Sequence, residues 1–199
     1  MTMLRRPFLI LPLLAAACSV LPDRPYVETR RFPLAPRREG PPPRAGRKVL
    51  MVRVMRAGPG MDVRGLRTLR PDGTQTVDFH AEWIAPPAEA AEDALRQWLI
   101  ASRMFSAVVS QGTRAHADLV LETELTALQA EPQRGIARAS LSALVLADAP
   151  QGGTRVLAQL PIEGTAPFAG GGADSVASAC QAALGAALAQ LETALARFA

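Results

Sequence analysis

The side chain best placed for chemistry is the thiol of Cys18, because the residues before it follow a specific pattern. Arg5 and Arg6 precede a short apolar run, and Ala15-Ala16-Ala17 stand directly before the cysteine. A basic segment, an apolar core and small residues at the cleavage point are typical of a secretory signal peptide. A cysteine directly after them is typical of a bacterial lipoprotein. We therefore predict a lipoprotein signal peptide over residues 1–17 and lipid attachment at Cys18.

The N-terminal segment has two other interpretations. A membrane-spanning helix needs roughly 20 apolar residues, whereas the run from Pro7 to Ala17 has 11 and contains Pro12. An ordinary signal peptide, in which Cys18 is incidental, is the second alternative. Ser19 follows the cysteine, where Asp would favour retention in the inner membrane. We therefore expect a lipid anchor in the outer membrane, with the protein on the periplasmic face.

The two histidines do not suggest a metal or catalytic site. His80 stands near Glu82, and His116 stands near Asp118, whereas a metal site needs three or four converging ligands. A histidine-dependent nucleophile would need an activated Ser or Cys, and no Gly-x-Ser-x-Gly sequence occurs. We predict no metal, no cofactor and no catalytic residues, and hence a protein that is not an enzyme.

Three further groups of residues are candidate chemical sites. Glu122 and Glu124 would share one face of a strand, and such a face is more often solvated than catalytic. Gly170-Gly171-Gly172 is not followed by the Gly-Lys-Ser/Thr of a phosphate-binding loop, which indicates a flexible loop before a helix. Cys180 would have no disulfide partner once Cys18 is acylated, and a lone exposed thiol is hazardous in an oxidising compartment. We expect Cys180 to be buried.

Length and charge bound the class of protein. The chain has 199 residues, and removal of a signal peptide would leave enough for one domain with a sizeable core. The formal net charge is +4, of which Arg5 and Arg6 supply two. This balance is a poor case for nucleic-acid binding.

Residues 18–47 differ from the rest of the chain. Residues 19–47 hold seven prolines and seven arginines, a composition that favours extended backbone. We predict a lipidated tether over residues 18–47 and a single folded domain over residues 48–199. The tether could also touch anionic head groups, and a solvated linker is the favoured interpretation. Whether the part from Tyr26 to Leu34 adds an edge strand to the domain is left open.

The first half of the domain reads as strands followed by a helix. Val49 to Met55 is a dense apolar run, and Asp72-Gly73 between two strand-like runs is typical of a hairpin turn. Ala85-Pro86-Pro87 then opens a helix. A short strand is expected at Phe105 to Val109. The buried stripe expected on this helix comprises Ala91, Leu95, Trp98, Leu99 and Ser102.

The second half reads as three long strands and a final helix. Strands over residues 117–130, 135–147 and 154–164, joined by short turns, predict an antiparallel meander. Asp174 or Ser175 is expected to cap the last helix. Together the elements predict an α+β or α/β sandwich with a mixed sheet of about five or more strands and two main helices. The stripe expected on the last helix comprises Val176, Cys180, Leu184, Leu188, Leu191 and Leu195.

The ordered set of these motifs resembles the ABC-type transport auxiliary lipoproteins, the group of paraquat-inducible protein C (PqiC-like). The resemblance covers nearly all of the chain after the signal peptide. It departs from the family where a single Tyr26 is followed by Val27, since the family often shows an aromatic-rich segment there. The matching features are Cys18, Tyr26, Val49-Leu50-Met51-Val52-Arg53-Val54, Trp83-Ile84-Ala85-Pro86-Pro87, Leu95, Leu99, Phe105, Ala117-Asp118-Leu119-Val120-Leu121 and the alanine-rich last helix.

The resemblance implies a fold and a function. It implies a three-layer fold similar to the N-terminal domain of TolB, with no cofactor and no catalytic residues. It also implies an outer-membrane lipoprotein that assists an ABC-type lipid transport system, with a mammalian-cell-entry (MCE) domain protein and ABC transporter components as partners. We expect binding to a partner by strand addition, with Phe105 to Val109 as a candidate edge.

Two alternatives from other classes stay open. One is a lipoprotein that helps to assemble an envelope complex unrelated to lipid transport, and the other is a lipid-anchored enzyme. The transported lipid, the direction of transport and the presence of a homo-oligomer are likewise left open by the sequence.

Overall fold

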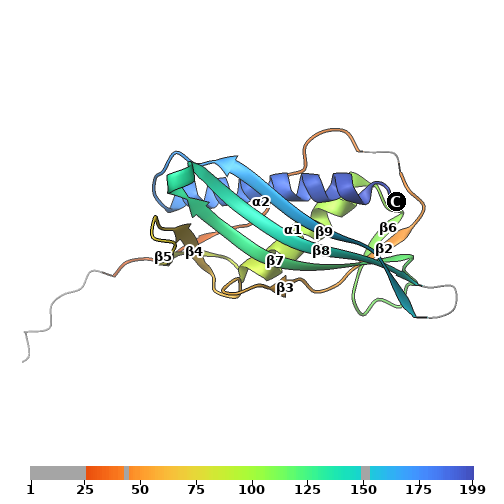
Figure 1. Ribbon diagram of the computed structural model, residues 1–199. Coiled ribbons are helices and arrows are strands. Elements are labelled where there is room, and N and C mark those ends of the chain that lie inside the picture. Colours follow the sequence, from red (N-terminus) through yellow and green to blue (C-terminus); the bar gives the residue numbers. More distant parts are fainter. Residues whose placement is uncertain (1–25, 43–44, 149–152) are drawn as a thin grey trace, which may run out of the picture.

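A computed structural model describes residues 26–42, 45–148 and 153–199 of the chain (Figure 1). They form one mixed sheet of nine strands with two α-helices, which confirms the predicted fold class. The strands are β1 (Arg30–Phe32), β2 (Val49–Val52), β3 (Arg56–Ala57), β4 (Gly65–Leu69), β5 (Gln75–Trp83), β6 (Ala107–Ser110), β7 (Leu119–Glu131), β8 (Ile136–Asp148) and β9 (Thr154–Pro167), and the helices are α1 (Pro87–Ser102) and α2 (Ala173–Leu195).

Strand β7 is the axis of the sheet. On one side it pairs antiparallel with β8, which pairs antiparallel with β9, as the predicted meander requires. On its other side β2, β3 and β4 pair with successive parts of β7, all in parallel. The sheet therefore divides there: β6 lies beyond β2, while β5 and β1 lie beyond β4.

Helix α1 begins where the sequence predicts. Pro86 and Pro87 suit this position because proline lacks the N–H that a first helical turn leaves unpaired. The expected stripe from Ala91 to Ser102 is buried. The helix ends at Arg103, the one non-glycine residue with a positive φ in the described ranges.

Helix α2 buries its predicted stripe, including Cys180. Its N-cap is Gly172 and no side chain caps it, so the predicted cap at Asp174 or Ser175 is wrong. The Asp174 carboxylate instead accepts hydrogen bonds from both terminal nitrogens of Arg30. The helix lies very close to β9, because a Cβ added at Gly164 would stand 2.2 Å from backbone atoms of Ala183 and Ala187.

Both helices cover the same face of the long strands (Figure 1). The core face of β7 carries Leu121 and Leu125, which are fully buried. The opposite face carries Glu122 and Glu124, which remain part-exposed and pair with arginines. The described residues therefore form two layers, and the expectation of three layers is wrong. Two helices of this length suffice to bury only one face of the sheet.

The domain begins earlier than the predicted boundary at residue 48. Strand β1 pairs in parallel with β5, so part of the segment from Tyr26 to Leu34 does add an edge strand. Leu34 enters the core, and Arg38 reaches α2. Composition predicted a solvated tether, but isolated apolar residues between prolines are enough to seat this segment. We call residues 30–42 the N-terminal strap.

Neither described helix combines the length and the apolar composition that crossing a bilayer requires.

Candidate functional site

The residues that the sequence offered for acid–base or metal chemistry do not converge. His80 lies in β5 and His116 in the loop before β7, and both are exposed. Glu122 binds Arg53 and Glu124 binds Arg56 across the solvated face of the sheet. Within residues 26–42, 45–148 and 153–199, no three His, Cys, Asp or Glu side chains stand together as metal ligands would.

The two cysteines have different outcomes. Cys18 lies outside the described residues, so its acylation stays a prediction. Cys180 is buried against the sheet, as expected for a thiol without a disulfide partner. Burial raises its pKa to about 12, so this thiol is protonated at neutral pH and is not a nucleophile.

A polar chain with two buried members, Gln129 and Glu131, lies on the face of the sheet that the helices leave uncovered. The Gln75 amide donates to Gln129, and the Gln129 amide donates to Glu131. Burial alone would raise the pKa of Glu131, but hydrogen bonds from Gln129 and Arg138 hold it below its usual range. A β-bulge between Leu125 and Ala127 turns these polar side chains away from the helices. Sequence alternation missed the cluster because it assumed an unbroken strand, and its role is to join β5, β7 and β8.

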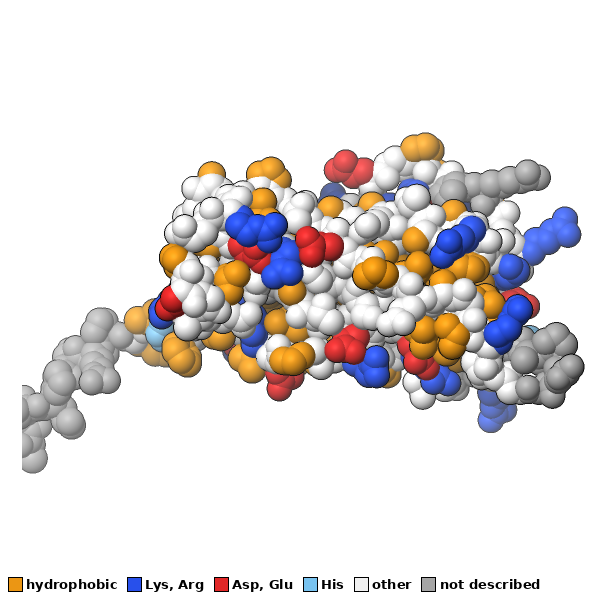
Figure 2. All heavy atoms as spheres, in the orientation of Figure 1, with side chains coloured by type: hydrophobic (Ala, Val, Ile, Leu, Met, Phe, Trp, Pro, Cys, Tyr) orange, Lys and Arg blue, Asp and Glu red, His pale blue; other side chains and the backbone are white. Residues whose placement is uncertain are grey.

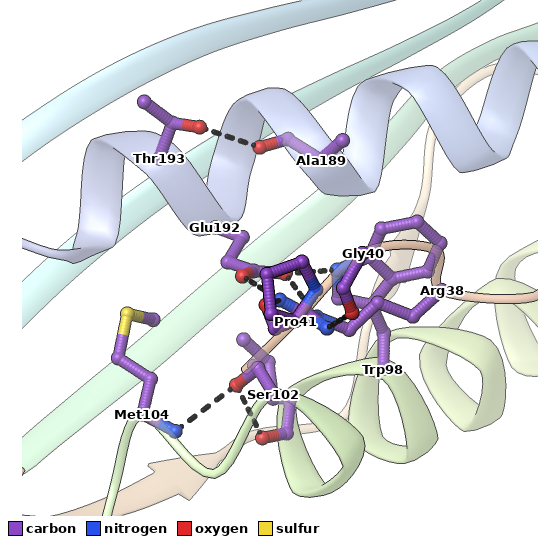
Figure 3. Close-up of polar contacts among 10 residues, drawn as sticks. Arg38, Gly40, Pro41, Trp98, Ser102, Met104, Ala189, Glu192 and Thr193 are labelled. Carbon is purple, nitrogen blue, oxygen red and sulfur yellow. Dashed lines mark hydrogen bonds and ion pairs between the residues drawn. The ribbon is translucent and has the colours of Figure 1, made fainter. Parts of the chain in front are cut away.

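The N-terminal strap is fixed to both helices by a second polar cluster (Figure 3). Arg38 donates from Nε and from a terminal nitrogen to the two carboxylate oxygens of Glu192, at 2.9 and 2.8 Å. The indole nitrogen of Trp98 donates to Glu192 Oε2 at 2.7 Å. Hydrogen bonding from Arg38, and then from Trp98, lowers the pKa of Glu192. Strap, α1 and α2 therefore meet at one carboxylate.

The outer edge of β9 is closed to further strands. Pro161 and Pro167 lie in the ladder with β8 although proline has no N–H, so their positions face away from β8. Glu163 shares this orientation by the two-residue alternation, and its outward N–H donates to the Gln190 side chain of α2 at 2.9 Å. Three outward donors of this edge are therefore missing or used, which hinders pairing with another chain.

The outer edge of β6 is open. Strand β6 pairs only with β2 among the described strands, and Ala107–Ser110 contains no proline. Val49 bonds with Asp118 on the β7 side, so its neighbour Leu50 bonds toward β6. Val108 is paired with Leu50 and directs its own N–H outward. An extended segment of a partner could add to this edge.

The open edge lies two residues later than predicted. Phe105 was expected to begin the strand, but its side chain is buried in the core. Ser106 donates its N–H to the carbonyl of Lys48 and leads into β6. The edge strand that the sequence predicted is therefore present, over Ala107–Ser110 instead of Phe105 to Val109.

The motif Trp83-Ile84-Ala85-Pro86-Pro87 divides between core and surface. Trp83 is buried, which agrees with the favoured interpretation as core packing, whereas Ile84 is largely exposed. Ile84 borders a shallow hollow between the strap and α1, which Pro33, Leu34 and Ala90 also line. Nothing in the described residues shows what would cover it.

The open edge and the N-terminal end lie at opposite ends of the molecule. Figure 1 shows β5 at the end where the N-terminal segment enters, and β2 with β6 at the other end, beside the C-terminus. The long strands β7, β8 and β9 connect the two ends. A chain held by its N-terminus would thus present β6 far from the point of attachment.

Comparisons with known proteins agree with this architecture. The model of a family described as "ABC-type transport auxiliary lipoprotein component" matches residues 32–192. A crystal structure of a Xanthomonas campestris protein of the DUF330 family is similar, with 21% identity, a TM-score of 0.69, and coverage of 84% of this chain and 95% of that one. A crystal structure of an uncharacterized protein has 15% identity, a TM-score of 0.61, and coverage of 86% and 98%. No curated protein sequence matches the chain.

Proposed function

The chain belongs to the ABC-type transport auxiliary lipoprotein component family, and from this premise we propose that it is a non-catalytic subunit of an ABC-type lipid transport system that acts by binding. The single observation that carries the proposal is the contrast between two edge strands of the sheet, of which β9 is closed and β6 is open. Burial of Cys180 and the separation of the histidines are consistent with binding instead of catalysis.

The proposed anchor is an acylated Cys18 in the outer membrane, after removal of residues 1–17. Its support is the basic segment, the apolar run and the small residues before the cysteine. Several acyl chains hold a protein stably where one binds only marginally, because each buried CH₂ contributes roughly 0.8 kcal/mol. The absence of Asp after the cysteine supports the outer membrane.

The proposed partner is an MCE-domain protein or another component of the transporter, which adds a strand to β6. The strap shortens the reach of the anchor, because residues 30–42 are seated on the domain. Eight residue steps separate Cys18 from Tyr26, which span at most about 29 Å when fully extended. The domain therefore stays close to the membrane, and the partner must supply most of the bridge across the periplasm.

Two measurements test this function. The first is mass spectrometry of the protein from its native envelope, where we expect an acylated Cys18 at the N-terminus and loss of processing in Cys18→Ala. The second is photocrosslinking from a benzoylphenylalanine at position 108, with position 159 on β9 as the control.

Adducts of an MCE-domain protein or a permease from position 108, and not from 159, would support the proposal. If neither protein appears and an unrelated envelope assembly does, the transport reading is wrong and the assembly alternative replaces it.

A further inference from the structure

The end of the molecule at which the N-terminus enters carries two strongly exposed aromatic side chains. Phe79 of β5 is 87% exposed and Tyr26 is 89% exposed, with Val27 beside it in sequence. Figure 2 shows hydrophobic side chains gathered around a histidine at the end of the molecule that carries β5. Single exposed apolar residues are common on protein surfaces, whereas a group of them at one end of a molecule often marks an interaction site.

An irregularity in the backbone of β5 directs Phe79 toward the solvent. Between the pairs Gly65↔Glu82 and Arg67↔Val77, β5 has four residues where β4 has one. The extra residues form a wide bulge, in which the Asp78 side chain accepts a hydrogen bond from the backbone N–H of His80. Bulges of this kind redirect a side chain. Phe79 therefore points out of the sheet as a consequence of local backbone geometry.

Gly65 makes this bulge possible. A Cβ added at Gly65 would lie 2.4 Å from the carbonyl oxygen of Asp78 and 2.4 Å from a methyl carbon of Val77. Any larger residue would push the bulged segment away. The bulge therefore packs closely against Gly65 of β4, whereas a loosely paired strand end would make no such contact.

We propose that Phe79, Tyr26 and Val27 form a membrane-docking tip that inserts into the interfacial region of the bilayer to which the chain is anchored. The inference rests on the proposed anchoring at Cys18. The argument for a bilayer as the occupant is distance: eight residue steps from Cys18 to Tyr26 allow at most about 29 Å. Aromatic side chains favour the boundary between head groups and acyl chains.

The charges at the tip favour a zwitterionic surface. Arg30 is paired with Asp174, and Arg31 is paired with Glu82. The exposed carboxylates of Glu28 and Asp78 are also at this end of the chain. These six side chains together carry no excess of basic charge, and we expect the contact to be apolar in character. Tethering raises the effective concentration of such a weak contact.

The consequence is a fixed orientation. An anchor at Cys18 alone would not by itself set the orientation of the domain relative to the bilayer. A second contact at Phe79 restricts that rotation and points the open edge of β6 away from the bilayer, because β6 lies at the opposite end (Figure 1). Contact of the tip with the bilayer would thus support the proposed function, because it presents the partner-binding edge of β6 to the periplasm.

The test uses the chain from Cys18 onward, coupled through Cys18 to a maleimide lipid in phosphatidylcholine vesicles. Cys180 is buried and does not compete for the maleimide. Phe79→Trp and Val156→Trp each add one indole at an exposed position, and the native Trp83 and Trp98 are buried. Vesicles with brominated acyl chains should quench the added fluorescence of Phe79→Trp and leave that of Val156→Trp unchanged.

Unquenched fluorescence of Phe79→Trp on the coupled protein would overturn the proposal, and so would quenching only after a protein partner is added. In the uncoupled chain, Phe79→Ser should weaken vesicle binding roughly tenfold, against no change for Val156→Ser. Because the coupling is chemical, these results do not depend on acylation in cells. Mass spectrometry of Cys18 tests the anchor separately, so failure of the tip and failure of the proposed function give different outcomes.

Discussion

The outer edges of β9 and β6 face the same physical problem and resolve it differently. Each presents backbone donors and acceptors that another chain could pair with. On β9, Pro161 and Pro167 remove donors, and the Gln190 side chain binds the N–H of Glu163. On β6, Ala107–Ser110 has no proline. The longer edge, which would be the greater aggregation hazard, is closed, and the short one is left available for a partner.

The largest expected effect comes from separating α2 from the closed edge with Gly164→Val. The new side chain would meet the backbone of Ala183 and Ala187. Backbone cannot move aside as a side chain can, so we expect the free energy of unfolding to fall by at least about 3 kcal/mol. Urea denaturation followed by circular dichroism measures this. Thr165→Val, at the adjacent exposed position, is the control, with a change within about 0.5 kcal/mol. A small loss in Gly164→Val would mean that the helix is not seated as described.

The next effect separates the two edges by function. Val108→Pro removes the outward donor of β6, and Gln159→Pro removes an outward donor of β9. We expect Val108→Pro, without any photocrosslinker, to reduce co-purification of the transporter component at least about tenfold, which corresponds to about 1.4 kcal/mol. Gln159→Pro should leave recovery unchanged. Both variants should retain the circular dichroism of the parent chain. Equal loss in both, or loss only in Gln159→Pro, would assign docking to a different surface.

Much of the fold could be predicted from the sequence, and the predictions that failed have local causes. Periodicity located α1, α2 and the meander, because long apolar stripes leave few alternatives for packing. The alternation of core-facing and outward-facing residues along β7 is interrupted by the bulge after Leu125. Beyond it, odd-numbered residues face away from the helices, which places Gln129 and Glu131 in the polar cluster. The sequence left open an edge strand between Tyr26 and Leu34, but it did not predict the contacts of Leu34 and Arg38. Composition averages over a segment, whereas these two residues act as single contacts. The closure of β9 by Gln190 depends on tertiary placement of α2, which no local pattern encodes.

The strap fixes α2, and hence the side chain that closes β9. Glu192 of α2 supplies the carboxylate that binds Arg38 of the strap. Glu192→Gln should lower the free energy of unfolding by about 1–2 kcal/mol at neutral pH, because hydrogen bonds to charged groups are stronger than neutral ones. The pKa of Glu192 is lowered from its ordinary value of 4.5 in the folded protein. The ionised carboxylate therefore stabilises the fold fully above that ordinary value. This stabilisation is lost as the pH falls through the lower pKa of the folded state.

Urea denaturation of the parent chain and of Glu192→Gln, at a series of pH values from neutral to acid, measures this contribution of the strap. The stabilities should differ at neutral pH and converge at acid pH below 4.5. Asp174→Asn, which breaks the exposed pair with Arg30, is the matched control and should leave stability nearly unchanged, because solvent screens an exposed ion pair. A constant difference between the parent and Glu192→Gln at every pH would show that ionisation of this carboxylate is not the source.

The smallest effect on stability should come from reopening β9 with the double variant Pro161→Thr and Gln190→Ala. Both positions are exposed, and neither contributes to the core, so the free energy of unfolding should change by less than about 1 kcal/mol. The change appears instead in self-association, because two outward donors, those of residues 161 and 163, become available together. Light scattering during concentration should show larger species for the double variant than for the parent chain. The matched control is Thr165→Val with Arg155→Ala, which also changes two exposed positions and leaves Pro161 and Gln190 in place. If the double variant stays as monodisperse as this control, then proline and Gln190 do not close the edge. Another feature, such as the twist of β9, would then have to explain why the longest edge of the sheet stays unpaired.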